Sequence, residues 1–349
     1  MRNLLIITQK VDENDDLLGF FVSWLREFSK RFDKVFVITL LKGGYDLPDN
    51  VYVYSLGKEK SALKLWRFFK LYFYLFRLVP KSSGIFCHMS PIFAIAAWPV
   101  AFIFRERIVL WYLHRSVTLR LKLSEKIVSS IVTATKESLN IESKKIIEIG
   151  HGIDIDRFRA DRNWDNLNSR QFRILSVGRI SPIKDYETLI KAAGILKEKG
   201  FDFRLKIVGR PVMVYDFEYF EKLKKLVQGL KLENFIEFMG FIPFSQIADY
   251  YKEADILINL APKGGIDKVV LEAMASGSLV LVSNTAFKKY FGEYDLFFKH
   301  GEPEDLAGKI IKLINLPNGE IKNTTDFLFR SVSQNHNLEN LIVKLAGLF

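Results

Sequence analysis

The 349-residue sequence lacks features on which several classes of protein depend. Its single cysteine, Cys87, excludes a disulfide framework and a cysteine-rich zinc site. Its longest uncharged run, residues 89–104, is shorter than the roughly 20 residues that span a bilayer. Acidic residues follow the short apolar run at residues 4–7, so the chain start does not look like a signal peptide. We therefore expect a cytoplasmic protein without membrane-spanning segments.

Two further absences narrow the function. No Gly-x-Gly-x-x-Gly loop follows an expected strand, which argues against a dehydrogenase with paired dinucleotide-binding domains. Acidic residues are outnumbered, since 51 Lys and Arg face 40 Asp and Glu for a net charge of +11. A basic balance favours an anionic partner such as nucleic acid, anionic lipid or a phosphorylated small molecule, although solubility alone also explains it.

What the sequence does contain is a regular alternation of short apolar runs and helical patterns. Repeated units of this kind predict an α/β fold with parallel sheets covered by helices on both faces. In the first half we expect strands at residues 4–8, 35–39, 84–88, 108–113 and 131–135, and helices at 20–31, 62–78, 91–104 (buried) and 119–129. In the second half we expect strands at residues 172–177, 203–208, 235–238, 256–259 and 279–282, and helices at 186–199, 217–230, 245–252, 268–276 and 304–316.

The alternation is interrupted once by a polar, weakly periodic stretch. The length and this break predict two doubly wound domains at residues 1–155 and 171–330, joined by a linker at 156–170. Residues 331–349 end in an amphipathic helix. Since ligands of such sheets bind outside the carboxyl ends of the strands, we expect the active site in a cleft between the domains.

Two loops of the second half carry cations directly after expected strands. Arg179 and Lys184 follow the strand at 172–177, just beyond Gly178, and Gly209 and Arg210 follow the strand at 203–208. An arginine fork and a lysine point charge at a strand end suit a diphosphate. The alternative is a solvated loop with ordinary surface charges.

A third segment, residues 264–277, combines paired glycines with the start of a helix. Gly264 and Gly265 allow a ligand to approach the backbone, and the free N–H groups of the helix start favour phosphate. Glu272 lies inside this helix among apolar neighbours, where a carboxylate is costly without partners. We interpret Glu272 as a ligand for a ribose diol, the alternative being a solvated helix residue.

These segments resemble the retaining glycosyltransferases of family 4, also called glycosyl transferases group 1, which have the GT-B fold. The resemblance covers most of the chain. It is carried by Gly150-His151-Gly152-Ile153-Asp154, Val177-Gly178-Arg179 with Lys184, Ile207-Val208-Gly209, Gly240-Phe241-Ile242-Pro243 and Leu271-Glu272-Ala273-Met274-Ala275-Ser276-Gly277.

The resemblance implies a role for individual residues. His114 would face the transferred sugar, Arg179 and Lys184 would hold the donor diphosphate, and Glu272 would bind the ribose. His114 as a hydrogen-bonded strand-end residue remains the alternative. The donor site then comprises Gly178, Arg179, Lys184, Gly209, Arg210, Gly264, Gly265, Ile266, Asp267, Lys268, Val269 and Glu272.

One position departs from the family pattern. The first glutamate of the glutamate-x7-glutamate signature falls on Gly264, and Asp267 stands where relatives have glycine. The change implies either an altered donor pocket with Asp267 compensating, which we favour, or a catalytically silent protein that binds sugars or partners.

The resemblance also implies the chemistry. A hexose would pass from a UDP- or GDP-sugar to the acceptor with retention, the leaving diphosphate taking the acceptor proton, with no cofactor and no metal. Asp154-Ile155-Asp156 looks like the metal-binding Asp-x-Asp of another glycosyltransferase fold, but it lies in the linker and we set it aside. The C-terminal helix is expected to cross back to the first domain.

The acceptor side is predicted from the helix at residues 62–78. Lys64, Arg67, Lys70 and Arg77 are interleaved with bulky aromatics, as in helices that lie on anionic lipid. This favours a lipid-linked or polysaccharide acceptor and a peripheral contact with the inner face of the plasma membrane. The alternative is an ordinary amphipathic helix with its aromatics in the core. No nucleic-acid motif is present.

Overall fold

The computed structural model describes residues 2–165, 167 and 170–349. The chain divides into two compact units. The first unit comprises Met1–Asp154, Pro243–Ser245 and His336–Phe349, and the second comprises Ile155–Ile242 and Gln246–Asn335. The C-terminal segment of the chain therefore belongs to the first unit.

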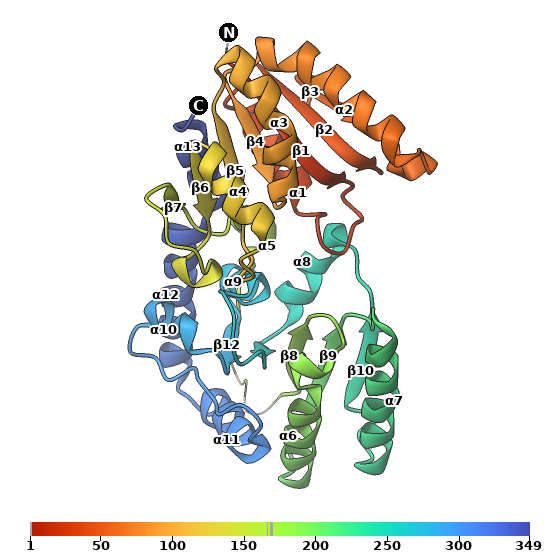
Figure 1. The fold of residues 1–349 in the computed structure, drawn as a ribbon. Helices are drawn as coiled ribbons and strands as arrows, with labels where there is room; N and C mark the ends of the chain where they lie inside the picture. Colours follow the sequence, from red (N-terminus) through yellow and green to blue (C-terminus); the bar gives the residue numbers. More distant parts are fainter. Residues whose placement is uncertain (1, 166, 168–169) are drawn as a thin grey trace. The chain divides into compact units, whose positions relative to one another are not determined.

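The first unit is built on a 7-stranded parallel sheet with the order β3-β2-β1-β4-β5-β6-β7 (Figure 1). Its strands are β1 (Asn3–Val11), β2 (Lys34–Lys42), β3 (Val51–Ser55), β4 (Ile85–His88), β5 (Ile108–Trp111), β6 (Ser130–Thr133) and β7 (Ile146–Glu148). Its helices are α1 (Phe21–Ser29), α2 (Lys64–Leu78), α3 (Pro91–Phe104), α4 (Leu119–Ile127) and α13 (Leu338–Ala346). Short 3-10 turns lie at Lys58–Lys60, Val79–Lys81 and Lys136–Ser138.

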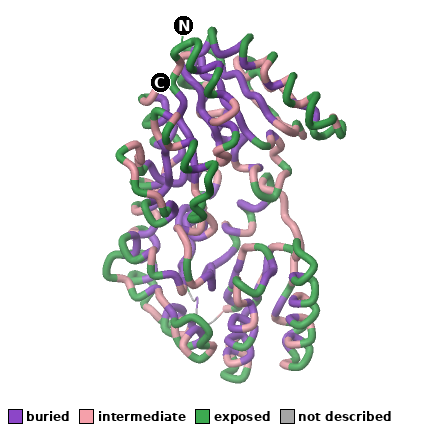
Figure 2. Tube along the Cα trace, in the orientation of Figure 1, coloured by how far each residue is buried: buried purple, intermediate pink, exposed green. Residues whose placement is uncertain are grey.

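Two separate cores cover the two faces of this sheet. On one face, α2, α3 and α4 contribute residues such as Leu75, Ala97 and Leu121. On the other face, α1 and α13 pack together, and Trp24 and Leu341 belong to one buried cluster. The inner strands β1, β4 and β5 are buried along most of their length (Figure 2), whereas the edge strands β3 and β7 are partly exposed. Burial on both faces is typical of parallel strands and accounts for their apolar runs.

The second unit repeats the plan on a smaller scale, with a 5-stranded parallel sheet of order β10-β9-β8-β11-β12. Its strands are β8 (Phe172–Val177), β9 (Phe203–Val208), β10 (Ile236–Gly240), β11 (Ile256–Asn259) and β12 (Leu279–Val282). Its helices are α5 (Ile155–Phe158), α6 (Tyr186–Glu198), α7 (Val214–Gly229), α8 (Phe244–Glu253), α9 (Lys268–Ala275), α10 (Lys288–Phe291), α11 (Pro303–Ile314) and α12 (Asn318–His336). Short 3-10 turns lie at Pro182–Lys184 and Thr285–Phe287.

The predicted fold class, two doubly wound parallel α/β units, is confirmed. The bounds of β8, β9, β11 and β12 agree with those expected from the sequence. The expectation that residues 91–104 form a buried helix is wrong on one side. Trp98 and Phe102 are 41% and 70% exposed, because only the side of α3 that carries Ala94 and Ala97 faces the sheet.

Candidate functional site

Three glycines line the carboxyl ends of neighbouring strands in the second unit. Gly178 follows β8, Gly209 follows β9 and Gly240 ends β10. The Gly178 amide donates to the Val208 carbonyl, and the Gly209 amide donates to the Gly240 carbonyl at 2.8 Å. Gly209 has a φ of +143°, and a Cβ there would lie 1.9 Å from the Gly178 oxygen. No larger residue fits at position 209, so this edge of the sheet presents bare backbone.

An ion pair spans the point where the strand order reverses, between β8 and β11. Lys184, from the loop after β8, places its Nζ 2.9 Å from Oδ2 of Asp267, which lies in the loop after β11. Asn259 at the end of β11 donates to the same Asp267 oxygen at 2.9 Å. Ligands of doubly wound sheets bind at this reversal. Lys184 is thus held by a partner at the position where a ligand is expected.

Arg179 lies beside a buried carboxylate that organises the next loop. Asp216 is fully buried, and its Oδ2 accepts the amides of Val212 and Met213 at 3.2 and 3.0 Å. The Arg179 Nε lies 3.8 Å from that oxygen, while 46% of the Arg179 side chain stays exposed. The guanidinium is therefore steered by Asp216 and keeps free surface. Arg210, in the loop after β9, lies over the Phe241 ring at 5.1 Å.

The glycine-rich segment forms an open loop that leads into α9. Gly264 has a φ of +139°, and a Cβ at this position would have no described atom within 4 Å. The Gly265 carbonyl accepts the Asn284 side-chain amide at 3.2 Å, and Ile266 is buried beneath the loop. Asp267 occupies the N-cap position of α9, whose first turn contains Lys268 and Val269. A glutamate at position 264 would be strained at this φ.

Glu272 is buried in α9 with two partners. Its side chain is 7% exposed, Oε2 accepts the Tyr251 hydroxyl at 2.8 Å, and Oε1 lies 3.8 Å from the Lys268 Nζ. Burial raises the pKa of Glu272, while Lys268 and Tyr251 act in the opposite direction. The Tyr251 hydroxyl occupies one carboxylate oxygen and leaves Oε1 on the Lys268 side.

Arg162 links the two helices that carry Tyr251 and Glu272. Its guanidinium donates to the carbonyls of Tyr251, Ala254 and Ser276 at 2.7, 2.8 and 2.9 Å, and burial lowers its pKa to about 10. It thereby ties the end of α8 to the end of α9. The sequence did not single out Tyr251 or Arg162. Tyr251 falls on the apolar face of α8 with Ile247, which is a usable signal, whereas Arg162 lies in a polar stretch that offers none.

The remaining predicted residues belong to the first unit. His114 follows β5 and is exposed, and its Nδ1 accepts the Ser116 amide at 3.0 Å. Lys64 and Arg77 are exposed on α2, and Arg67 and Lys70 are partly exposed. The structure thus gathers the predicted donor residues in the second unit and leaves His114 and the basic residues of α2 in the first.

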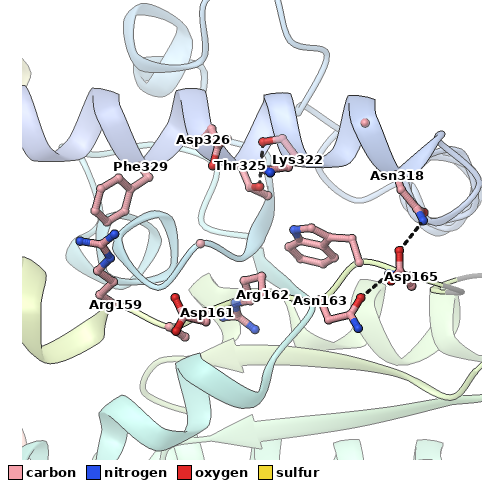
Figure 3. A pocket seen from close by; sticks show the side chains of 14 residues that line it. Arg159, Asp161, Arg162, Asn163, Asp165, Asn318, Lys322, Thr325, Asp326 and Phe329 are labelled. Carbon is pink, nitrogen blue, oxygen red and sulfur yellow. Dashed lines mark hydrogen bonds between the residues drawn. The ribbon is translucent and has the colours of Figure 1, made fainter.

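A separate hollow in the second unit contains none of the predicted donor residues among the described residues that line it. It has a volume of about 500 Å³ and lies between the segment around Arg162 and the helix α12 (Figure 3). Asp165 accepts the Asn318 side-chain amide at 3.0 Å across its rim. Arg162 lines this hollow, and its guanidinium is held by the carbonyls of Tyr251, Ala254 and Ser276. We assign the hollow no part in the donor site.

Neither a membrane span nor a metal cluster is found in the described structure. In the part of the chain that the structure describes, no helix is both long and apolar enough to cross a membrane. Residues 2–165, 167 and 170–349 contain no group of three His, Cys, Asp or Glu side chains arranged to hold a metal ion.

Comparison with known proteins finds a family match within the second unit. Residues 158–325 match the family model of glycosyl transferases group 1. Mannosylfructose-phosphate synthase of Agrobacterium fabrum is 27% identical over 187 residues, which are 50% of this chain and 41% of that protein. Alpha-monoglucosyldiacylglycerol synthase of Streptococcus pneumoniae is 28% identical over 225 residues, which are 59% of this chain and 48% of that protein. The match thus spans less than half the length of either relative.

A solved structure matches the whole chain. The crystal structure of Anabaena Alr3699/HepE in complex with UDP and glucose has a TM-score of 0.73 and 17% identity, covering 99% of this chain and 98% of that one. At this identity the likeness shows the fold, which is GT-B. The chain therefore has the GT-B fold, and residues 158–325 within it match the model of glycosyl transferases group 1.

Proposed function

We propose that this protein transfers a hexose from a UDP- or GDP-sugar to a lipid-linked or polysaccharide acceptor, with retention of configuration. The observation that carries the proposal is the Lys184–Asp267 pair at the strand reversal of a unit that matches glycosyl transferases group 1. A structural neighbour, HepE, binds UDP and glucose, which supports a nucleotide sugar as donor.

The proposed roles follow from where the charges lie. Arg179 and Lys184 would stabilise the diphosphate as it leaves, together with the free amides at the start of α9. The leaving diphosphate would take the acceptor proton, so catalysis consists mainly of positioning and charge stabilisation. This scheme uses neither a cofactor nor a metal ion.

The same scheme assigns the neighbouring groups. Glu272 would bind the ribose diol through Oε1, since Oε2 already accepts the Tyr251 hydroxyl. Asp267 would hold Lys184 in place through their 2.9 Å contact and so supply the carboxylate that Gly264 does not. His114 would face the transferred sugar.

For the acceptor, we propose a lipid-linked or polysaccharide chain bound by the first unit. The relative from Streptococcus pneumoniae is named for a diacylglycerol product, which favours a lipid. Lys64, Arg67, Lys70 and Arg77 on α2 would face anionic groups near the acceptor.

A second candidate is a catalytically silent protein that binds sugars or partners through the same fold. It is favoured by Gly264, whose φ of +139° leaves no unstrained place for the signature glutamate. The two candidates share a donor site and differ in turnover.

The donor site is tested by thermal unfolding with a panel of UDP- and GDP-sugars and with free UDP and GDP. A ligand at 100 times its dissociation constant stabilises the folded state by about 2.7 kcal/mol. We expect stabilisation by one nucleotide family. We expect this stabilisation to be lost in Glu272→Gln and kept in Glu198→Gln, the matched change on the exposed end of α6. Stabilisation by no nucleotide, or equal stabilisation of Glu272→Gln, contradicts the assignment.

A further inference from the structure

The outer sides of three neighbouring helices in the first unit are apolar and exposed. The helices α2, α3 and α4 cover the same face of the sheet, which they contact through their inner sides. Their outer sides expose Trp66, Phe69 and Phe73 of α2, Trp98 and Phe102 of α3, and Leu119 of α4. We call these six residues the outer apolar surface. Its exposed fractions range from 41% at Trp98 to 84% at Leu119.

This arrangement reverses the usual orientation of an amphipathic helix. Leucines such as Leu71 and Leu75 face the sheet, while the larger aromatics of α2 face outward. Trp66, Phe69 and Phe73 recur every three or four residues and so form one stripe. Large contiguous apolar patches on a soluble fold mark sites of contact with proteins or membranes. The exposed aromatic side of α2 therefore has the composition of a contact surface.

The charge around the outer apolar surface selects the kind of partner. The sequence has no Asp or Glu between Glu59 and Glu106, a stretch that contains all of α2 and α3. The same stretch carries the cations Lys60, Lys64, Arg67, Lys70, Arg77, Lys81 and Arg105. Aromatic side chains interleaved with unopposed cations complement a surface that is apolar inside and anionic at its rim.

We propose that the outer apolar surface docks the protein on a bilayer that contains anionic lipid. The end of α3 enters the acyl boundary through Trp98 and Phe102, because α3 carries no charged side chain along its length. Lys70 and Arg77 of α2 reach the headgroups, since long basic side chains extend toward the polar zone. Bilayer docking thus rests on two helices, one aromatic and basic and the other uncharged.

The position of α4 links this surface to the proposed reaction. Leu119 begins α4, and the loop just before it contains His114. A bilayer that contacts Leu119 therefore lies next to the residue proposed to face the transferred sugar. This part of the inference rests on the proposed function and names its acceptor as a lipid in the docked membrane. The docking itself requires no donor.

Docking is tested by flotation of the full chain with vesicles of phosphatidylcholine, with and without phosphatidylglycerol. We expect strong binding to the mixed vesicles and weak binding to phosphatidylcholine alone. The double change Lys70→Gln with Arg77→Gln should weaken binding to mixed vesicles about 25-fold, since each cation near an anionic surface contributes roughly fivefold. Raised salt should weaken it too.

The apolar contribution has its own variant and control. Trp98→Ser with Phe102→Ser should lower the partition coefficient at least about tenfold on both vesicle types, because two aromatic side chains no longer enter the apolar layer. Val214→Ser with Tyr215→Ser makes the matched change at 83% and 57% exposed residues of the second unit and should leave binding unchanged. Thermal unfolding of each variant confirms that it is folded.

Three outcomes overturn the inference. The first is a folded wild type that binds neither kind of vesicle. The second is equal binding by the wild type and the Trp98/Phe102 variant. The third is a second copy on this surface, seen in sedimentation as a dimer that Trp98→Ser with Phe102→Ser converts to a monomer. Nucleotide stabilisation measured in parallel separates these results from failure of the donor site.

Discussion

The two units place different chemistry at the same topological position. In the first unit the strand order reverses between β1 and β4, where the Thr8 hydroxyl lies 3.1 Å from Nδ1 of the buried His88, whose ring stacks on Phe21. In the second unit the reversal between β8 and β11 carries the Lys184–Asp267 ion pair. One position is aromatic and the other is charged. The shared topology therefore supplies the position of a ligand, while the side chains after the strands decide which ligand charge is favoured.

The units also differ in whether their cationic side chains lie beside carboxylates. In the second unit, Lys184, Arg179 and Arg170 each lie beside an aspartate. On α2 of the first unit the cations stand among aromatics in a stretch of sequence without acids. Paired cations are held in fixed positions, as a diphosphate site requires. Cations on an exposed outer side suit a fluid surface such as a membrane.

The largest effect on nucleotide binding is expected from removing the positive charge at the reversal between β8 and β11. Lys184→Ala should raise the dissociation constant of the bound nucleotide diphosphate about 10- to 100-fold, because a hydrogen bond to a charged group contributes roughly 1.5–3 kcal/mol. Titration calorimetry measures the effect. Lys191→Ala, an exposed lysine of α6, is the matched control and should bind as the wild type does. Unchanged affinity in Lys184→Ala would remove Lys184 from the donor site.

A second substitution, Asp255→Asn, is expected to lower the stability of the second unit without affecting nucleotide binding. Asp255 lies at the amino ends of the strands, where its carboxylate accepts both guanidinium nitrogens of Arg170 at 3.0 and 2.8 Å and the Arg173 amide at 2.8 Å. Burial acts to raise the pKa of Asp255, but these hydrogen bonds and charges lower it overall. Asp255→Asn should cost about 2 kcal/mol of unfolding free energy at neutral pH and leave nucleotide affinity unchanged.

The pH dependence of that effect has a defined sign. A lowered pKa means that the ionised form stabilises the folded state, so the stabilisation is present above the unfolded value of 3.8 and is lost as the pH falls through the folded value. Urea unfolding at neutral and acidic pH should therefore show a difference between wild type and Asp255→Asn that shrinks in acid. A constant difference would contradict the role of the ionised carboxylate.

The smallest expected effect concerns the partner of Glu272. Tyr251→Phe removes the hydroxyl that donates to Oε2 and lets the carboxylate turn, so the nucleotide dissociation constant should rise about fivefold, corresponding to roughly 1 kcal/mol. The neighbouring change Tyr250→Phe, which affects a ring over Lys206, should leave it unchanged. If both variants bind alike, Tyr251 does not position Glu272.

The sequence predicted the inner strands of both sheets and missed β3 and β7, the edge strands of the first sheet, which are only partly buried. A buried parallel strand is a short apolar run between polar ends, as at β9, and its bounds can be found without knowing its neighbours. The helix α12 was missed because its Asn, Thr, Ser and Gln residues give no clear 3.6-residue period. The sidedness of α3 could not be predicted because its residues are apolar all round, so only packing decides which of them face out.

The candidate site, too, could be predicted from the sequence only in part. Arg179, Lys184 and Glu272 were singled out from the sequence because strand ends and helix starts are places where charge is informative. The aspartates beside Arg179 and Lys184 lie at the starts of α7 and α9, and sequence spacing does not show that these helix starts meet the loop after β8. The position of Tyr251 against Glu272 likewise depends on how α8 packs on α9, which only the folded chain determines.

The central claim, sugar transfer, is tested most directly by product formation. The full chain is incubated with membrane lipid extract and with UDP- and GDP-sugars chosen from the unfolding panel, and the products are followed by mass spectrometry. We predict free nucleotide diphosphate together with a lipid that is heavier by one hexose, formed at least about 100-fold more slowly by Lys184→Ala. A wild type that binds a nucleotide sugar but releases no diphosphate with any acceptor would contradict this account and identify a binding protein.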